Sequence, residues 1–421
     1  MLTRRFFLKA GGVALVTVGV SGGPGFLARA ALAAPGTGAT SSRRRKVLVT
    51  IFQRGAMDGL AAVPPISAAD LKSLRPRLAT SGARSAGDAA LLDLETGFGL
   101  HPALEPLLPM WKEKRLAIVH AVGSPDPTRS HFDAQDFMET GTPGRKGTPN
   151  GWLNRAVGLL GHDGSPFRAV AMTPALPRSL YGDEPALAVT NLADFKVQLP
   201  GADRTAAAAG QGFESLYEQT SQGLLRDTGG ETFRAIHRLS AAEIERYRPA
   251  AGADYPQTPL GNALRQIALL IKSDVGLEIA FAESGGWDTH VQQAATFARQ
   301  ARDLAQAIHA FWIDLGPYQD QVLLTTMTEF GRTVRENGSG GTDHGHGSCL
   351  FVLGNKVDGG KIHGVFPAGL EPGALYEGRD LPVTTDFRAV FCELAGKHLG
   401  VKDDAKLFPG WTGKRIPLLK A

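Results

Sequence analysis

Short runs of continuous apolar and β-branched residues constrain the fold of this chain more than any other feature. The runs at 46–53 and 115–122 read Lys-Val-Leu-Val-Thr-Ile-Phe-Gln and Arg-Leu-Ala-Ile-Val-His-Ala-Val. Strands that are apolar on both faces are typical of a parallel sheet that is covered by helices on each side. We therefore expect two buried strands here, and further strands at 168–172, 277–283, 321–328 and 348–353.

Segments with helical spacing lie between these runs. Apolar residues recur every three or four positions through 292–315, which predicts an amphipathic helix. Further helices are expected at 102–112, 262–273 and 387–399. The alternation of strands and helices predicts a doubly wound α/β fold, with a mostly parallel sheet and helices on both faces. Residues 200–258 are polar and Ala-rich, and they indicate a helical insertion or cap.

The first 34 residues have the pattern of a twin-arginine signal peptide. Arg4 and Arg5 stand in Thr-Arg-Arg-Phe-Phe-Leu-Lys, and a weakly apolar run at 10–27 follows them. Ala31 and Ala33 supply the small residues that a signal peptidase needs. We expect the Tat translocase and signal peptidase to act on this segment, so that the mature protein is periplasmic or secreted.

The chain after the signal peptide is expected to hold one domain. Residues 35–45 are rich in Gly, Ser, Thr and Arg and predict a flexible linker, and residues 46–418 are expected to form the α/β domain. Glycines interrupt the apolar run near the N-terminus, and no later segment is long and apolar enough to span a bilayer. We therefore expect no membrane span in the mature protein.

The positive net charge does not indicate a nucleic-acid partner. Residues 1–46 carry eight Lys or Arg residues and no acid, and subtracting these eight charges from the overall +4 leaves −4 for the remainder. A nucleic-acid surface would need the basic excess in the folded part. Nucleic acid is therefore not expected as a partner.

The chain contains two cysteines, Cys349 and Cys392. An oxidising compartment would permit a disulfide between them. Nothing in their spacing resembles a disulfide framework, so we favour two buried, unpaired thiols.

Aspartate and histidine residues follow the predicted strands. Asp58 comes after the first strand, and Asp288 and His290 come after the strand at 277–283. A glycine-rich loop before the last strand carries Asp343, His344 and His346, and His363 is a possible extra ligand. Because ligands gather at the carboxyl ends of parallel strands, we expect these side chains to meet. Carboxylate and imidazole groups suit divalent ions such as zinc or manganese, which support displacement at phosphorus or sulfur.

Several of these residues have a structural alternative. Asp58 could cap the turn before a helix, and Ser130 and Asp133 could be an N-cap and a first-turn acid. Trp287 is expected to pack in the core. His120 could be a core histidine or could face the site.

Three longer phrases resemble a known family. These are RSHFDAQDFMETG at 129–141, GGWDTH at 285–290 and TEFGRTVRENGSGGTDHGHG at 328–347. They resemble the twin-arginine-exported bacterial proteins grouped as domain of unknown function 1501, and the resemblance runs from about Lys46 to near the end. That family is usually placed with the alkaline phosphatase and sulfatase superfamily. The grouping implies an alkaline phosphatase-like sheet, two metal ions and a nucleophile at a helix N-terminus.

The resemblance also implies individual roles. Asp58 is similar to the superfamily ligand after the first strand, and Asp343 with His344 resembles the Asp-His pair on the same metal. Asp288 and His290 resemble ligands of the second metal, although alkaline phosphatases usually place three residues within this pair and here there is one. The third ligand of that metal would be His346 or His363.

The expected activity is hydrolysis of a phosphate or sulfate ester by a metal-dependent enzyme acting on a small anionic ester. Ser130 is the candidate nucleophile, with Thr128 in reserve, and Arg129 or Arg332 could bind the anionic group through a planar fork. No Cys-x-Pro-x-Arg sulfatase signature is present.

Two other functions remain open. The first is a non-catalytic binding or assembly protein that keeps the fold. The second, a redox enzyme, ranks last because the chain has no Gly-x-Gly-x-x-Gly after a strand and no cysteine cluster.

Overall fold

The computed structural model describes residues 45–67, 69–79, 90–162, 164–165, 167–192 and 246–420. The signal peptide and all but the last residue of the predicted linker lie outside these residues. Of the insertion predicted at 200–258, only 246–258 is described, and it consists mainly of turns and irregular chain.

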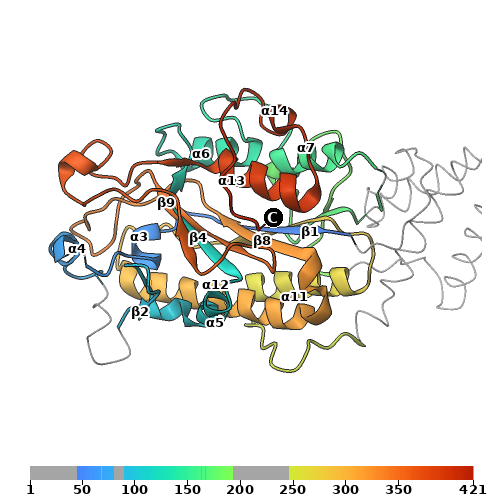
Figure 1. The fold of residues 1–421 in the computed structure, drawn as a ribbon, viewed down its shortest axis with the longest axis horizontal. Coiled ribbons are helices and arrows are strands. Elements are labelled where there is room, and N and C mark those ends of the chain that lie inside the picture. The colour runs from blue at the N-terminus through green and yellow to red at the C-terminus, as the bar shows by residue number, and fades with distance from the viewer. Residues whose placement is uncertain are drawn as a thin grey trace, which may run out of the picture.

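A nine-stranded sheet runs through the centre of the described structure (Figure 1). Its order is β10-β4-β9-β8-β1-β7-β5-β6, with β11 also beside β4. All pairs are parallel except those of β9, which runs antiparallel to β4 and β8. The strands are β1 (Val47–Gln53), β4 (Leu116–Gly123), β5 (Ala169–Ala171), β6 (Leu187–Ala188), β7 (Ile279–Ser284), β8 (Val322–Met327), β9 (Ser348–Leu353), β10 (Lys361–His363) and β11 (Thr385–Asp386).

Helices cover both faces of the sheet, as the sequence predicted (Figure 1). One face carries η1 (Pro102–Leu107), α5 (Leu108–Lys112), α11 (Pro259–Lys272) and α12 (Gln293–Leu315). The other carries α6 (His131–Thr140), α7 (Trp152–Leu159), α13 (Phe387–Leu394) and α14 (Asp404–Leu407). Within the described ranges, no helix combines the length and apolar character needed to cross a membrane.

The remaining elements are short. They are α3 (Gly59–Ala62), α4 (Ala69–Leu74), β2 (Leu92–Asp93), β3 (Gly99–Leu100), η2 (Arg178–Leu180), η4 (Gly316–Gln321), η5 (Pro372–Ala374) and the π-helical turn η6 (Ala395–Leu399). Strands β2 and β3 pair with each other in a small antiparallel sheet.

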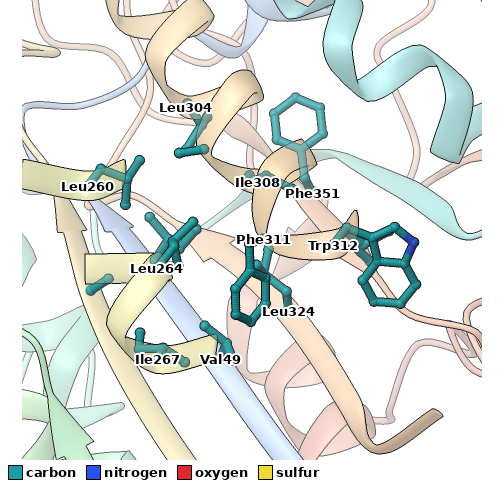
Figure 2. Packing of buried hydrophobic residues seen from close by; sticks show 14 of the residues in the cluster. Val49, Leu260, Leu264, Ile267, Leu304, Ile308, Phe311, Trp312, Leu324 and Phe351 are labelled. Atoms are coloured by element: carbon teal, nitrogen blue, oxygen red, sulfur yellow. The ribbon is translucent and has the colours of Figure 1, made fainter. Parts of the chain in front are cut away.

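Strand β1 shows why this sheet needs helices on both sides. Val47, Val49 and Ile51 face the core under α11 and α12, whereas Leu48 and Phe52 face the core on the other side of the sheet. Figure 2 shows Val49 packed with side chains from both helices. Because burial of one large apolar side chain contributes about 1.5–3 kcal/mol, each face stabilises the sheet substantially.

Local sequence explains where the helices begin. The side chain of Thr258 accepts a hydrogen bond from the Gly261 amide at 3.1 Å, and Pro259 occupies the first turn, so α11 starts three residues before the predicted boundary. The helix predicted at 102–112 is helical throughout. Its first half is a 3₁₀ segment that contains Pro106, which lacks the amide hydrogen of an α-helix.

The reversed direction of β9 places the glycine-rich loop. Ser348, the first residue of β9, pairs with Val122 near the carboxyl end of β4. The loop that precedes β9 therefore stays at the same sheet edge as the ends of β1, β7 and β8. This edge is where the sequence predicted a ligand site.

Both cysteines are free and buried, which confirms the favoured prediction. Cys349 belongs to the core on one face of the sheet, and Cys392 to the core on the other. Trp287 is also buried as predicted and packs edge-on against Phe297.

His120 is a core histidine. Its Nε2 lies 2.9 Å from the carbonyl oxygen of Val63, and its ring packs against Phe98 and Phe366. Burial lowers the pKa of His120 to about 4, despite the backbone hydrogen bond that acts in the other direction.

This pKa predicts acid lability. Below pH 6.5 the unfolded state binds a proton that folded His120 takes up only near pH 4, so stability is lost as the pH falls through this window. We expect His120 to account for about 2 kcal/mol of the stability lost between pH 7 and pH 5. Urea unfolding of the wild type and of His120→Gln at both pH values measures this loss of stability. Glutamine is the chosen replacement because it keeps a hydrogen-bond donor for Val63 and does not titrate. Equal losses in the two proteins would contradict the prediction.

Candidate metal centre

Four side chains meet at the sheet edge where β4, β7 and β8 end and β9 begins. His131 is the first residue of α6, Asp288 and His290 follow β7, and His344 lies in the loop before β9. The Nε2 of His344 lies 3.0 Å from Nε2 of His131 and 2.9 Å from Nε2 of His290. Oδ1 of Asp288 lies 3.0, 3.3 and 3.5 Å from Nε2 of His290, His344 and His131, respectively.

Each histidine has its other ring nitrogen beside an oxygen. Nδ1 of His344 is 2.8 Å from the carbonyl oxygen of Arg129, which can only accept a hydrogen bond. Nδ1 of His131 is 2.9 Å from Oε1 of Glu329, and Nδ1 of His290 is 3.3 Å from Oδ1 of Asp343. Neutral rings with these partners carry their hydrogen on Nδ1, which leaves all three Nε2 lone pairs directed at one another and at a carboxylate.

Three of these donors have the spacing of ligands around one ion. His131, Asp288 and His344 form a group whose ligand atoms all lie within 4.8 Å of one another, and their pairwise separations are 3.0, 3.3 and 3.5 Å. Ligands held at about 2.0–2.1 Å in a tetrahedron around zinc are about 3.3–3.4 Å apart. The side chains could therefore hold a divalent ion after small adjustments, with His290 next to the group.

A buried arginine holds Asp288 in place. Nη1 of Arg332 donates to Oδ1 of Asp288 at 2.8 Å, and its other nitrogens donate to the hydroxyl and carbonyl oxygens of Thr342. Burial alone would raise the pKa of Asp288, but the hydrogen bond and charge of Arg332 outweigh it and lower that pKa. The carboxylate is thus kept ionised, as a metal ligand must be.

Glu329 holds the imidazole of His131 in place, as Arg332 holds Asp288. It is fully buried at the end of β8, and its carboxylate accepts hydrogen bonds from Gln135 and from the Gly55 amide at 2.9 and 2.8 Å. Burial acts to raise the pKa of Glu329, but the hydrogen bonds from His131, Gln135 and Gly55 lower it. An ionised carboxylate behind a ligating imidazole fixes the ring and raises its basicity.

The surroundings raise the pKa of His131 and lower that of His344. The hydrogen bond to Glu329 is the main cause of the raised pKa of His131, to which the charges of Glu329 and Asp288 also contribute. Burial lowers the pKa of His344. Either a proton on His131 or a cation among the Nε2 atoms would relieve the electrostatic repulsion between the facing lone pairs.

Glu329 offers a test of this support. We expect Glu329→Gln to weaken zinc affinity about 10- to 100-fold, because the neutral amide stabilises the imidazole less. Competition with a chromophoric chelator measures the affinity. Glu278→Gln is the control, since Glu278 is a buried, ion-paired glutamate that precedes β7 at the opposite sheet edge. Unchanged affinity in Glu329→Gln would exclude the supporting role.

The structure brings together Asp288, His290 and His344 from the predicted ligand set, with Asp343 beside His290. Asp58 is not part of the group. Its carboxylate caps α3 through the Ala61 amide, and it bonds to Arg75 at 2.7 and 3.2 Å and to Gln293 at 2.6 Å. This is the capping alternative that the sequence left open, with a buried ion pair added to it.

Two predicted histidine ligands also lie outside the group. His346 is buried and stacked on Tyr376, and burial lowers its pKa. His363 lies on β10, where its Nε2 is 3.0 Å from the carbonyl oxygen of Asp358. The described residues thus bring together one donor group, which contains none of Asp58, His346 and His363.

The predicted catalytic residues have different environments. Ser130 is the exposed N-cap residue of α6, and its side chain makes no capping hydrogen bond. The Thr128 hydroxyl accepts from the Ser130 amide at 3.3 Å. Arg129 pairs with Asp380 and Glu377, and Arg332 is committed to Asp288 and Thr342.

His131 is the donor that the sequence analysis did not select. It stands between the candidate nucleophile Ser130 and Phe132, directly after a loop that leaves a predicted strand. A histidine at the start of a helix that follows a strand was the available signal. Its partner Glu329 also stands directly after a strand, in Thr-Glu-Phe-Gly-Arg.

Comparison with known proteins identifies the family. No curated protein is detectably similar to the chain. The family described as protein of unknown function DUF1501 matches residues 45–409, which include every residue of the metal centre. This match confirms the resemblance seen in the three sequence phrases. The chain therefore belongs to the DUF1501 family.

Proposed function

We propose that this protein is an exported metal-dependent hydrolase of phosphate or sulfate esters. One observation supports it above all. Three imidazole Nε2 atoms and a carboxylate oxygen face one another at 2.9–3.5 Å, while each histidine has an oxygen at Nδ1. Such a donor set suits zinc or manganese.

The proposed ion would polarise the ester oxygen and lower the pKa of an attacking hydroxyl. Ser130 is the proposed source of that hydroxyl, because its exposed side chain directly precedes the proposed ligand His131 in the sequence. It also stands at the N-terminus of the ten-residue helix α6, where the helix dipole and free amides favour an anionic group. The side chains of Arg129 and Arg332 would act indirectly, since both already hold carboxylates.

The relation to the alkaline phosphatase and sulfatase superfamily is part of this proposal. The mixed sheet and the ligands at its edge support it, whereas the ion pair of Asp58 departs from the superfamily pattern. Export by the Tat translocase, removal of residues 1–34 and a periplasmic or secreted location are proposed from the sequence of the first 34 residues.

A non-catalytic binding protein is the second candidate. It is favoured by the ion pairs that Arg129 and Arg332 form with acidic partners, because these pairs already balance the charge of each guanidinium. Such a protein would hold the ion and cleave no ester.

Turnover of 4-nitrophenyl phosphate and 4-nitrophenyl sulfate tests the hydrolase proposal. Chelated protein is expected to be inactive and to regain activity with zinc or manganese, and Ser130→Ala is expected to abolish it. Tight binding of metal without turnover across a broad panel of esters would favour the non-catalytic candidate. Full turnover by metal-free protein would contradict the proposal.

A further inference from the structure

A pocket of about 280 Å³ lies beside the metal centre. An apolar cavity of about 150 Å³ is large enough to hold benzene, so this pocket has room for a substantial organic group. It is lined by Leu74, Thr333, Val334, Arg335, Glu336, Asn337, Asp343, Leu370, Pro372, Leu375, Gly378 and Arg379.

Two lining residues contact the ligand histidines. Asp343 places Oδ1 3.3 Å from Nδ1 of His290, and it also accepts a hydrogen bond from Asn337 at 3.1 Å. Nη2 of Arg379 donates to the carbonyl oxygen of His344 at 2.6 Å. The pocket and the metal centre are therefore adjacent, with Asp343 on the Nδ1 side of His290.

The walls of the pocket combine an apolar surface with an exposed arginine. Val334 and Leu370 belong to a small buried hydrophobic cluster, against which Leu74 and Leu375 pack. Arg335 is exposed, and its guanidinium has no hydrogen bond or ion pair with any residue in the described ranges. Arg379, in contrast, is paired with Asp380.

We infer that this pocket binds the organic part of the substrate, an apolar group of about one aromatic ring that carries a second anionic substituent facing Arg335. The inference rests on the proposed function, because it assigns the other end of the same ligand to the metal centre. It narrows the substrate class from any small anionic ester to aryl-sized esters with two negative groups. A free guanidinium recognises a carboxylate through paired N–H donors, which an apolar wall alone cannot do.

Binding of two phosphonates to the zinc-loaded protein tests the inference. Phenylphosphonate and 4-carboxyphenylphosphonate share the same ring, and neither is cleaved, because carbon replaces the ester oxygen. Isothermal titration is expected to show about tenfold tighter binding of the carboxylated ligand, and Arg335→Gln should remove this difference. Arg299→Gln is the control, since Arg299 is an exposed arginine of α12 outside the pocket lining, and it should retain the difference.

The apolar wall is tested by a second variant. Leu375→Trp should fill the pocket and weaken both phosphonates, while binding of zinc remains unchanged. Equal affinity of the two ligands for the wild type, loss of the preference in both arginine variants, or absence of binding would overturn the inference. Because the phosphonates are not cleaved, their binding can be measured independently of turnover. If they bind as expected but no ester is hydrolysed, the hydrolase proposal is wrong and the assignment of the pocket is retained.

Discussion

His344→Ala is expected to lower zinc affinity more than about 100-fold and to reduce turnover to the level of chelated protein. His344 is the central donor, since its Nε2 contacts Nε2 of both other histidines and lies 3.3 Å from Asp288. Its loss removes one ligand and leaves Asp288 as the donor that neighbours both remaining histidines. Elemental analysis and hydrolysis of 4-nitrophenyl phosphate measure the two effects.

His363→Ala is the matched control for this prediction. His363 is half-buried, and its ring lies beside the Asp358 carbonyl, outside the donor group. We expect normal metal content and turnover in this variant. Wild-type metal content in His344→Ala would remove that residue from the centre. Equal losses of metal and turnover in both variants would indicate general misfolding, which thermal melts of both variants would detect.

The second large effect concerns stability. Arg75→Met is expected to lower the free energy of unfolding by about 3–5 kcal/mol, because it leaves the Asp58 carboxylate buried without its partner. Both side chains of this ion pair are nearly inaccessible, and Arg75 also donates to the carbonyl oxygens of Thr333 and Val334 at 2.7 Å. Urea unfolding measures the loss.

Arg77→Met, two residues away, is the control for that experiment. Arg77 is 55% exposed in its ion pair with Glu336, so its replacement is expected to cost less than about 1 kcal/mol. A loss in Arg75→Met as small as that in Arg77→Met would contradict the buried-pair account. Asp58→Asn separates the ion pair with Arg75 from the metal ligation that the sequence predicted for Asp58. A folded variant should keep its normal metal content.

The main strands were predictable because their apolar character is continuous. The six runs named from the sequence are all strands of the sheet, and their ends differ by at most two residues from the predicted ones. Strands β6, β10 and β11 were not predicted, since these segments of two or three residues lie outside the continuous apolar runs and form by pairing with β4 or β5. The antiparallel direction of β9 depends on the path of the chain, which local residue patterns do not encode.

Part of the metal centre was predictable for a related reason. Asp288, His290 and His344 follow or precede core strands, and sheet geometry brings such positions to one edge. His131 was not predicted, because in sequence a ligating histidine in the first turn of a helix looks the same as a solvated one. Asp58 has the expected position for a ligand, but its partner Arg75 lies 17 positions further along the chain, and local sequence gives no sign of their pairing.

Anomalous diffraction from crystals of the zinc-loaded protein, recorded on both sides of the zinc absorption edge, tests the central claim most directly. One strong peak is expected about 2 Å from Nε2 of His131, Nε2 of His344 and Oδ1 of Asp288. Absence of a peak between these atoms, or a peak only beside other residues, would contradict it.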